Sequence, residues 1–258
     1  MPETDLALLV EAAQEAGRIA RTYSGATAQS WEKPDNAGPV TECDLAVNRM
    51  LEERLRAARP DYGWLSEESE DNEARLEAET VFVIDPLDGT RSFMEGGRTF
   101  AHALAVVRNG LVQAGVVYLP LLDKLYTATY GGGAKLNGTP IKTALKPGLD
   151  RATVLAAKPV LQPRFWKGGV VPDIDRVYRP SLAYRLCLVA EGRYDAMITL
   201  RDSWEWDIAA GALIMAEAGA VVTDRYGAPL RFNNARPKVA GVLAASRAVH
   251  AEMRAALA

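Results

Sequence analysis

Hydrophobic and polar positions follow two different periods along the chain, which predicts helices and strands in turn. The segment from about Asp5 to Tyr23 carries a single apolar stripe with helical spacing. A second helix is predicted after Thr41, which can cap it with Asp44 three residues further on. The positions expected to face the core are Leu6, Leu9, Val10, Ala13, Ala16 and Ile19 in the first helix and Val47, Met50, Leu51 and Leu55 in the second.

Short apolar runs bounded by turn residues predict a group of strands next. They are expected at residues 80–84, 101–108, 111–118 and 124–129. Asn109-Gly110, between two of these runs, is a strong hairpin signal. The glycine-rich segment GGGAKLNG at 131–138 lacks the spacing of a nucleotide-binding fingerprint, and it is interpreted as turns.

The second half of the chain predicts an alternation of strands and helices. Strands are expected at 153–157, 194–199 and 239–243, and helices at 182–190, 205–219 and 246–257. Pro147 and Gly148 mark the predicted boundary between two lobes. The fold class is therefore α/β, with an α+β lobe at residues 1–146 followed by an α/β lobe at 147–258.

Composition narrows the classes of function. The chain has 258 residues, of which 48% are hydrophobic and 24% charged, as in ordinary soluble globular proteins. A net charge of -3 without a long basic run indicates neither a nucleic-acid polymer nor an anionic membrane as a partner. The acidic N-terminal segment does not resemble a signal peptide, and no apolar run reaches the ~20 residues needed to cross a bilayer. A cytoplasmic protein is expected, with Cys43 and Cys187 as buried apolar groups.

The run FVIDPLDGTRSF at residues 82–93 ends an apolar strand with two carboxylates, Asp85 and Asp88. Pro86 opposes an ordinary continuation of the strand, so these carboxylates are expected at an edge open to a ligand. Together with the carbonyl of Leu87 they form an all-oxygen cluster of the kind that hard cations prefer, and magnesium fits it better than zinc.

The next residues of the run fit a phosphate. Gly89 lets the backbone approach a ligand closely, and Thr90 begins a helical turn whose free amides favour an anionic oxygen. The same string of residues is also typical of a plain turn. However, two like charges at the end of an apolar strand are costly unless a bound cation neutralises them.

Other carboxylates follow predicted strands or begin helices. Glu67 and Glu68 end a short apolar strand in WLSEESED at 64–71, and Asp207 lies near the start of an apolar helix. Each alone has an ordinary explanation, as solvated charge or as a helix-start carboxylate. Together they indicate a site. The chain has only two histidines, His102 and His250, so a Ser-His-Asp triad or a histidine-ligated zinc has little support, and His102 is interpreted as structural.

Taken together, these motifs resemble those of the inositol monophosphatase family of magnesium-dependent, lithium-sensitive phosphomonoesterases, over nearly the whole chain. The resemblance is carried by DPLDGT at 85–90, SEES at 66–69, EWDIAAG at 205–211, VTECD at 40–44 and PSLAYRLCLVAEG at 180–192. Cys43 stands where the family usually has alanine. The resemblance implies a layered αβαβα sandwich, with the metal cluster between the two lobes and Asp207 brought to Asp85.

The resemblance also implies the roles of individual residues. Two or three Mg²⁺ ions would be held by Glu67, Asp85, Asp88, Asp207 and the carbonyl of Leu87, with Asp85 bridging two ions and with lithium inhibition expected. The catalytic residues would be Thr90, Asp44, Glu67 and Glu68, with Thr90 bonded to Asp44 to orient and help deprotonate the attacking water. The substrate-binding residues would be Leu87, Asp88, Gly89, Thr90, Arg91 and Asp207. A homodimer is expected.

The substrate is a small phosphorylated metabolite, and several identities stay open. GWLSEES and DGTR resemble bacterial 3'(2'),5'-bisphosphate nucleotidases, which remove a phosphate from adenosine 3',5'-bisphosphate. DGTRSF also occurs in histidinol-phosphate phosphatases, and Leu200 stands where inositol monophosphatases carry an acidic residue. Arg91 or Arg185 could meet a second phosphate. A non-catalytic metal- or nucleotide-binding regulatory module is the alternative from another class.

Overall fold

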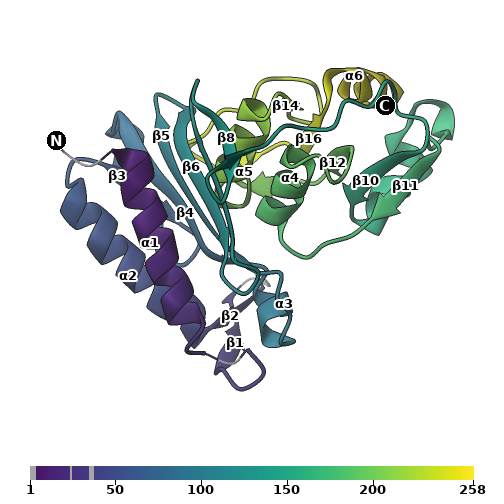
Figure 1. Cartoon of the computed structure of the whole chain (residues 1–258). Helices are drawn as coiled ribbons and strands as arrows, with labels where there is room; N and C mark the ends of the chain where they lie inside the picture. The colour runs from purple at the N-terminus through teal and green to yellow at the C-terminus, as the bar shows by residue number, and fades with distance from the viewer. Residues whose placement is uncertain (1–3, 24, 35–37) are drawn as a thin grey trace.

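Helices and sheets alternate in five layers in the computed structural model, which describes residues 4–23, 25–34 and 38–258 (Figure 1). The first layer is formed by α1 (Asp5–Ala20) and α2 (Glu42–Ala58), and both cover one face of a seven-stranded sheet. Two helices lie between this sheet and a five-stranded sheet, α4 (Leu182–Ala190) and α5 (Glu205–Glu217). The last layer, α6 (Arg247–Ala256), packs on the five-stranded sheet. The arrangement confirms the predicted αβαβα sandwich.

The seven-stranded sheet has its strands in the order of the sequence. They are β3 (Gly63–Ser66), β4 (Thr80–Asp88), β5 (Ala101–Arg108), β6 (Leu111–Leu119), β7 (Lys124–Thr129), β8 (Gly133–Leu136) and β9 (Thr139–Pro140). Within this described sheet only β3 and β4 pair in parallel, with Ser66 opposite Ile84. The carboxyl ends of these two strands therefore lie side by side, and the residues that follow meet at one edge of the sheet.

The five-stranded sheet follows a connection at residues 141–151. Its spatial order is β11 (Ile174–Val177), β10 (Ala152–Ala156), β12 (Ala196–Thr199), β16 (Val242–Ala245) and β14 (Val221–Thr223). Two short pairs stand apart from the main sheets: β1 (Ser30–Glu32) with β2 (Pro39–Thr41), and β13 (Ser203–Trp204) with β15 (Lys238–Val239). Short helices fill the connections: η2 (Glu73–Glu77), α3 (Thr90–Met94), η3 (Lys158–Leu161), η4 (Pro163–Phe165) and η5 (Lys167–Gly169).

Local sequence explains why the outer helices form and how they pack. Thr41 accepts a hydrogen bond from the Asp44 amide, and the Asp44 carboxylate accepts one from the Thr41 amide, so the predicted capping box is present. The apolar stripes of α1 and α2 bury Leu9 and Leu51 against the first sheet. Separate clusters of buried residues form on the other side of that sheet, around α4 and α5, and beneath α6. Among the described residues, no helix is both long and apolar enough to cross a bilayer.

Most predicted elements are present with bounds that differ by at most two residues, and four differ more clearly. The first helix ends at Ala20 rather than Tyr23. The strand predicted to end at residue 84 continues to Asp88, because a bulge between Asp85 and Asp88 accommodates Pro86 without ending the pairing. The segment 131–138 is not only turns, since residues 133–136 pair with β7 as β8. The strand predicted at 239–243 is split into β15 and β16 at Gly241, whose φ of 72° no ordinary strand residue adopts.

Candidate active site

Parallel pairing of β3 and β4 brings the first two carboxylates together. Glu67 directly follows β3, and its amide donates a hydrogen bond to the carbonyl of Ile84 at 3.2 Å. Asp85 is the next residue of β4 and is only 1% exposed. One of its carboxylate oxygens, Oδ1, accepts a hydrogen bond from the Leu87 amide at 2.9 Å, whereas Oδ2 is buried and has no hydrogen-bond partner among the residues that the structure describes. A buried carboxylate oxygen in this condition fits a bound cation.

Asp207 reaches the same point from the second half of the chain. It lies in the first turn of α5, the helix between the two sheets. Carboxylate oxygens of Glu67, Asp85 and Asp207 all lie within 4.8 Å of one another. The predicted approach of Asp207 to Asp85 is thereby confirmed. The oxygen-only donor set suits a hard cation such as Mg²⁺ better than a softer metal.

Asp88 is held at the edge of this cluster by the start of α4. Its Oδ2 accepts hydrogen bonds from the Ser181 hydroxyl at 2.6 Å and from the Ala183 amide at 2.7 Å. Ser181 is also the N-cap of α4, so the same hydroxyl serves the helix and the carboxylate. These bonds occupy one oxygen of Asp88. Sequence reasoning did not identify Ser181, because it lies 93 residues away along the chain.

Thr90 and Asp44 form the pair expected from the sequence. The Thr90 hydroxyl lies 3.1 Å from Asp44 Oδ1 and 3.2 Å from the Leu87 carbonyl oxygen. Asp44 is 1% exposed, and its other oxygen accepts hydrogen bonds from the amide and hydroxyl of Thr41. The capping box of α2 therefore orients Asp44 toward Thr90.

Gly89 turns the chain from β4 into α3. Its φ of 103° lies in the left-handed region that favours glycine, and it is the N-cap of that short helix. The carbonyl of Pro86 is hydrogen-bonded to His102, whose Nδ1 lies 2.5 Å from the carbonyl oxygen. Burial lowers the pKa of His102 to about 4, so the ring is neutral and Nδ1 carries the donated proton. The interpretation of His102 as a structural residue agrees with these contacts.

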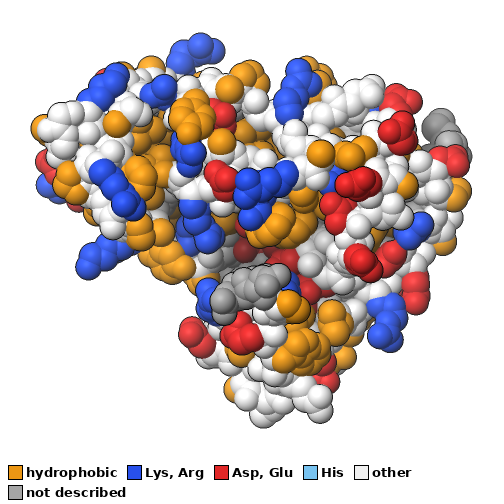
Figure 2. Space-filling view, turned by 180° about the vertical axis from the view of Figure 1, so that it is seen from behind, with side chains coloured by type: hydrophobic (Ala, Val, Ile, Leu, Met, Phe, Trp, Pro, Cys, Tyr) orange, Lys and Arg blue, Asp and Glu red, His pale blue; other side chains and the backbone are white. Residues whose placement is uncertain are grey.

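A cavity of about 310 Å³ opens over the carboxylates. Its walls include most of the predicted site residues: Glu67, Asp85, Leu87, Asp88, Gly89, Thr90, Arg91 and Asp207. On the face shown in Figure 2, acidic side chains lie in a recess with basic side chains around it. Asp44 and Glu68 are not among the lining residues, and they are hydrogen-bonded to Thr90 and Lys33 respectively.

Burial and mutual repulsion act on the acidic cluster. Burial raises the pKa of Asp85 well above its ordinary value, and the charges of Glu67 and Asp88 add to this. Burial likewise raises the pKa of Asp207. For Asp88, burial outweighs the hydrogen bonds from Ser181 and Ala183, and the pKa rises to about 6. The folded chain thus holds several carboxylates together at a cost that a bound cation would relieve.

Lys33 is a charged neighbour of the cluster that sequence reasoning missed. Its ammonium group lies 2.7 Å from Glu67 Oε1 and 2.5 Å from Glu68 Oε1. Burial, followed by the charge of Glu67, raises the pKa of Glu68 to about 7. Lys33 precedes β2 in a loop, and no local pattern in the sequence marks it as a partner of Glu67.

The mouth of the cavity carries aromatic and cationic side chains that were also not predicted. Tyr178 is 51% exposed and Trp204 is 36% exposed, and both line the cavity together with Arg201. Arg185, the other arginine considered for a second phosphate, lies behind these residues. It is buried, its guanidinium lies 4.5 Å from the Tyr178 ring centre, and it donates hydrogen bonds to the carbonyls of Arg179 and Pro180. It is not among the residues lining the cavity, whereas Arg91 is.

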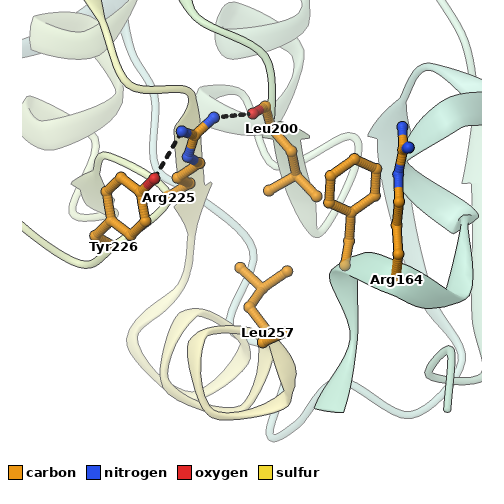
Figure 3. Close-up of a pocket in the computed structure, with 7 residues that line it drawn as sticks. Arg164, Leu200, Arg225, Tyr226 and Leu257 are labelled. Atoms are coloured by element: carbon orange, nitrogen blue, oxygen red, sulfur yellow. Dashed lines mark hydrogen bonds between the residues drawn. The ribbon is translucent and has the colours of Figure 1, made fainter. Parts of the chain in front are cut away.

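Another cavity, of about 300 Å³, lies elsewhere in the second half of the chain. Leu200 and Leu257 supply apolar walls, and Arg225 donates hydrogen bonds to the Leu200 carbonyl and the Tyr226 hydroxyl (Figure 3). No aspartate or glutamate lines it among the described residues. This cavity therefore lacks the carboxylates that line the cavity over Asp85.

Comparison with known proteins identifies the family. The inositol monophosphatase family matches the chain over residues 1–258. The chain belongs to the inositol monophosphatase family. An inositol-1-monophosphatase of Rhizobium meliloti is 35% identical over 233 residues, with 86% of this chain and 86% of that protein covered. Membership of this family supports a phosphatase, which is a hydrolase.

Two further relatives show the breadth of the family. The Nus factor SuhB of Escherichia coli K12 is 32% identical over 233 residues, covering 86% of this chain and 85% of that protein. The solved structure of an IMPase from Thermotoga maritima is 28% identical, covers 96% of this chain and 94% of its own, and superposes with a TM-score of 0.80. The similarity therefore extends over the whole layered fold.

Proposed function

We propose that the protein is a Mg²⁺-dependent phosphomonoesterase that hydrolyses a small phosphorylated metabolite. The observation that carries the proposal is the convergence of Glu67, Asp85 and Asp207 within 4.8 Å, beside the hydrogen-bonded pair of Thr90 and Asp44. Three buried or half-buried carboxylates at one point favour the binding of a cation, and the neighbouring hydroxyl is suited to orient and activate a water molecule.

The metal would be held by the oxygens that already converge. These are the carboxylates of Glu67, Asp85, Asp88 and Asp207 and the carbonyl of Leu87, and two or three ions are expected. Bound Mg²⁺ would supply Lewis acidity, a lowered pKa of water and neutralisation of phosphate charge. Asp85 Oδ2, which is buried without a partner in the described part of the chain, would gain one from such an ion. Lithium inhibition belongs to the same proposal.

Thr90 and Asp44 would orient the attacking water. When the Thr90 hydroxyl donates its proton to Asp44 Oδ1, at 3.1 Å, its oxygen is free to accept a hydrogen bond from water. The other oxygen of Asp44 is held by hydrogen bonds from Thr41. Asp44 can therefore accept a proton that is transferred through the Thr90 hydroxyl. Positioned proton transfer of this kind typically accelerates a reaction by ~10² to 10⁴-fold.

The residues that line the cavity indicate which substrates it could bind. Amides of Gly89 and Thr90 are proposed to hold phosphate oxygens, with Arg91 and Arg201 available at the rim for further negative charge. The exposed rings of Tyr178 and Trp204 favour a leaving group with an apolar or aromatic face. We therefore propose inositol monophosphate or adenosine 3',5'-bisphosphate as the substrate, with histidinol phosphate as the alternative.

A panel of substrates tests the proposal. Phosphate release is measured with Mg²⁺ from inositol 1-phosphate, adenosine 3',5'-bisphosphate, histidinol phosphate and fructose 1,6-bisphosphate, each with and without EDTA. We expect turnover of at least one of the first two, abolished by EDTA. A panel in which no compound is hydrolysed, or in which EDTA changes nothing, would contradict the proposal.

A non-catalytic regulatory module is the competing function. Relatives named as Nus factors make it a concrete alternative for a chain of this family. The presence of Asp44, Asp85, Asp88 and Thr90 favours an enzyme, because a module that only binds has no use for the Thr90 and Asp44 pair. Binding of Mg²⁺ and nucleotide without any phosphate release would favour the module.

The assembly of the protein is proposed on the family resemblance, and its location on the character of its sequence. A homodimer is expected, and sedimentation measures it directly. A cytoplasmic location is proposed, with a small phosphorylated metabolite as the partner and with neither a nucleic-acid polymer nor a membrane as a binding surface.

A further inference from the structure

The segments that carry Glu67 and Asp207 are both bonded to a third segment outside the cavity. Glu205 is the first residue of α5 and lies two residues before Asp207. Side chains two positions apart on a helix point in nearly opposite directions. Asp207 lines the cavity, whereas Glu205 is 0% exposed and contacts the turn at residues 231–235.

Glu205 uses both of its carboxylate oxygens on that turn. Its Oε2 accepts a hydrogen bond from the Asn233 amide at 2.6 Å. Its Oε1 accepts bonds from the Asn234 amide at 2.9 Å and from the Asn234 side chain at 2.7 Å. Three donors on one buried carboxylate hold the start of α5 in a fixed relation to the turn.

Arg75 binds the same turn from the other side. It lies in η2, in the connection that begins with Glu67, and is 2% exposed. Its guanidinium donates to Asn233 Oδ1 at 2.6 Å and to the Asn234 carbonyl at 3.0 Å. It also forms a two-pronged pair with Asp71, at 2.6 and 2.9 Å, so the connection is bonded to itself as well as to the turn.

Asn233 is the residue common to both sets of bonds. Its backbone amide binds Glu205, its side-chain oxygen binds Arg75, and its side-chain nitrogen donates to the Arg75 carbonyl at 3.1 Å. Its φ of 62° is the left-handed conformation that asparagine tolerates better than most residues. A continuous path of part-buried hydrogen bonds therefore joins the Glu67 connection to α5.

We propose that Arg75, Glu205 and Asn233 form a clamp that positions Glu67 and Asp207 relative to each other for metal binding. The inference rests on the proposed metal site. Mg²⁺ requires near-ideal octahedral geometry, so ligands from separate segments must be held at a fixed spacing. The carboxylates repel one another before an ion binds, and the clamp opposes the separation that this repulsion favours. None of the three residues touches the cavity.

Substitution of Asn233 by glycine isolates the clamp. Glycine adopts the same φ without strain and keeps the amide that binds Glu205, but it removes both side-chain bonds to Arg75. Asn233→Asp restores an acceptor for the Arg75 guanidinium. Asn137→Gly is the matched control, because Asn137 has a φ of 48° and two side-chain hydrogen bonds, to the Leu125 amide and the Asp123 carbonyl, in a distant turn.

The experiment titrates metal-free protein with Mg²⁺ by calorimetry and measures hydrogen exchange of the 66–79 amides without metal. In Asn233→Gly we expect the Mg²⁺ dissociation constant to rise about tenfold, equivalent to about 1.4 kcal/mol, and the 66–79 amides to exchange faster. Asn137→Gly should leave both unchanged, and Asn233→Asp should recover most of the affinity.

The possible results separate the clamp from the proposed function. Equal Mg²⁺ affinity in Asn233→Gly and the unsubstituted protein would overturn the clamp, as would an equal loss in Asn137→Gly, which would mean general destabilisation. Failure of the unsubstituted protein to bind Mg²⁺ would instead overturn the metal site itself. Faster exchange at 66–79 without metal reports the coupling independently of catalysis.

Discussion

Replacing Asp88 by asparagine should stabilise the metal-free protein. Asp88 is 8% exposed, and the pKa of its carboxyl group rises from an ordinary 3.8 to about 6, chiefly through burial. Asparagine can present its amide oxygen to the Ser181 hydroxyl and the Ala183 amide, so the bonds that hold the start of α4 are retained. The substitution therefore removes a charge and keeps the contacts.

The size of the effect follows from the pKa. Each pKa unit corresponds to 1.36 kcal/mol, so the rise from 3.8 to about 6 costs the folded state about 3 kcal/mol once Asp88 is ionised. An acid whose pKa is higher in the folded state binds protons more tightly there. Its cost is absent below pH 3.8, grows as the pH rises, and is complete above pH ~6.

Urea unfolding in EDTA at two pH values measures this. At pH 7.5 we expect Asp88→Asn to raise the free energy of unfolding by up to about 3 kcal/mol, and at pH 4 we expect little difference from the unsubstituted protein. Asp150→Asn, at an exposed position, should change neither value appreciably. If Asp88→Asn were no more stable at pH 7.5, or gained equally at both pH values, the electrostatic reasoning about the cluster would be wrong.

Three further predictions concern the same cavity. Thr90→Ala and Asp44→Asn should each lower kcat by ~10² to 10⁴-fold with little change in KM. In steady-state kinetics the double variant should lose little more activity than the worse single variant. If the two losses multiplied instead, the residues would not share one water molecule. Removal of Mg²⁺ by EDTA should lower the melting temperature and the exchange protection of residues 66–73, because an ion that binds only the folded state stabilises it; no change in either would argue against a metal site. Gly89→Ala should cost about 1 to 3 kcal/mol in urea unfolding, because alanine is strained at a φ of 103°, and an unchanged unfolding midpoint would contradict this.

Those parts of the fold that depend on neighbouring residues were predictable. The hairpin at Asn109-Gly110 and the capping box of Thr41 and Asp44 form within a few positions of the chain, and both are present. The predicted ends of helices and strands were less accurate where a tertiary contact decides where the element ends. Gly241 breaks its predicted strand, and a side-chain carbon there would lie 2.5 Å from the Thr199 carbonyl, a contact that the local pattern does not reveal.

The sequence by itself determined which acidic residues form the site and how Asp85 and Asp88 are spaced. Asp85 and Asp88 are separated by only two residues, and the pleat and bulge of one strand set their spacing. The family resemblance implied that Asp207 joins the acidic cluster. Only the tertiary structure decided that Ser181 meets Asp88 and that Lys33 meets Glu67. These contacts depend on how the layers stack, because burial between packed sheets and helices brings segments together regardless of their separation along the chain. The physical reason is that hydrogen bonds and ion pairs act over a few ångströms of space, whereas sequence patterns report only what lies within a few residues.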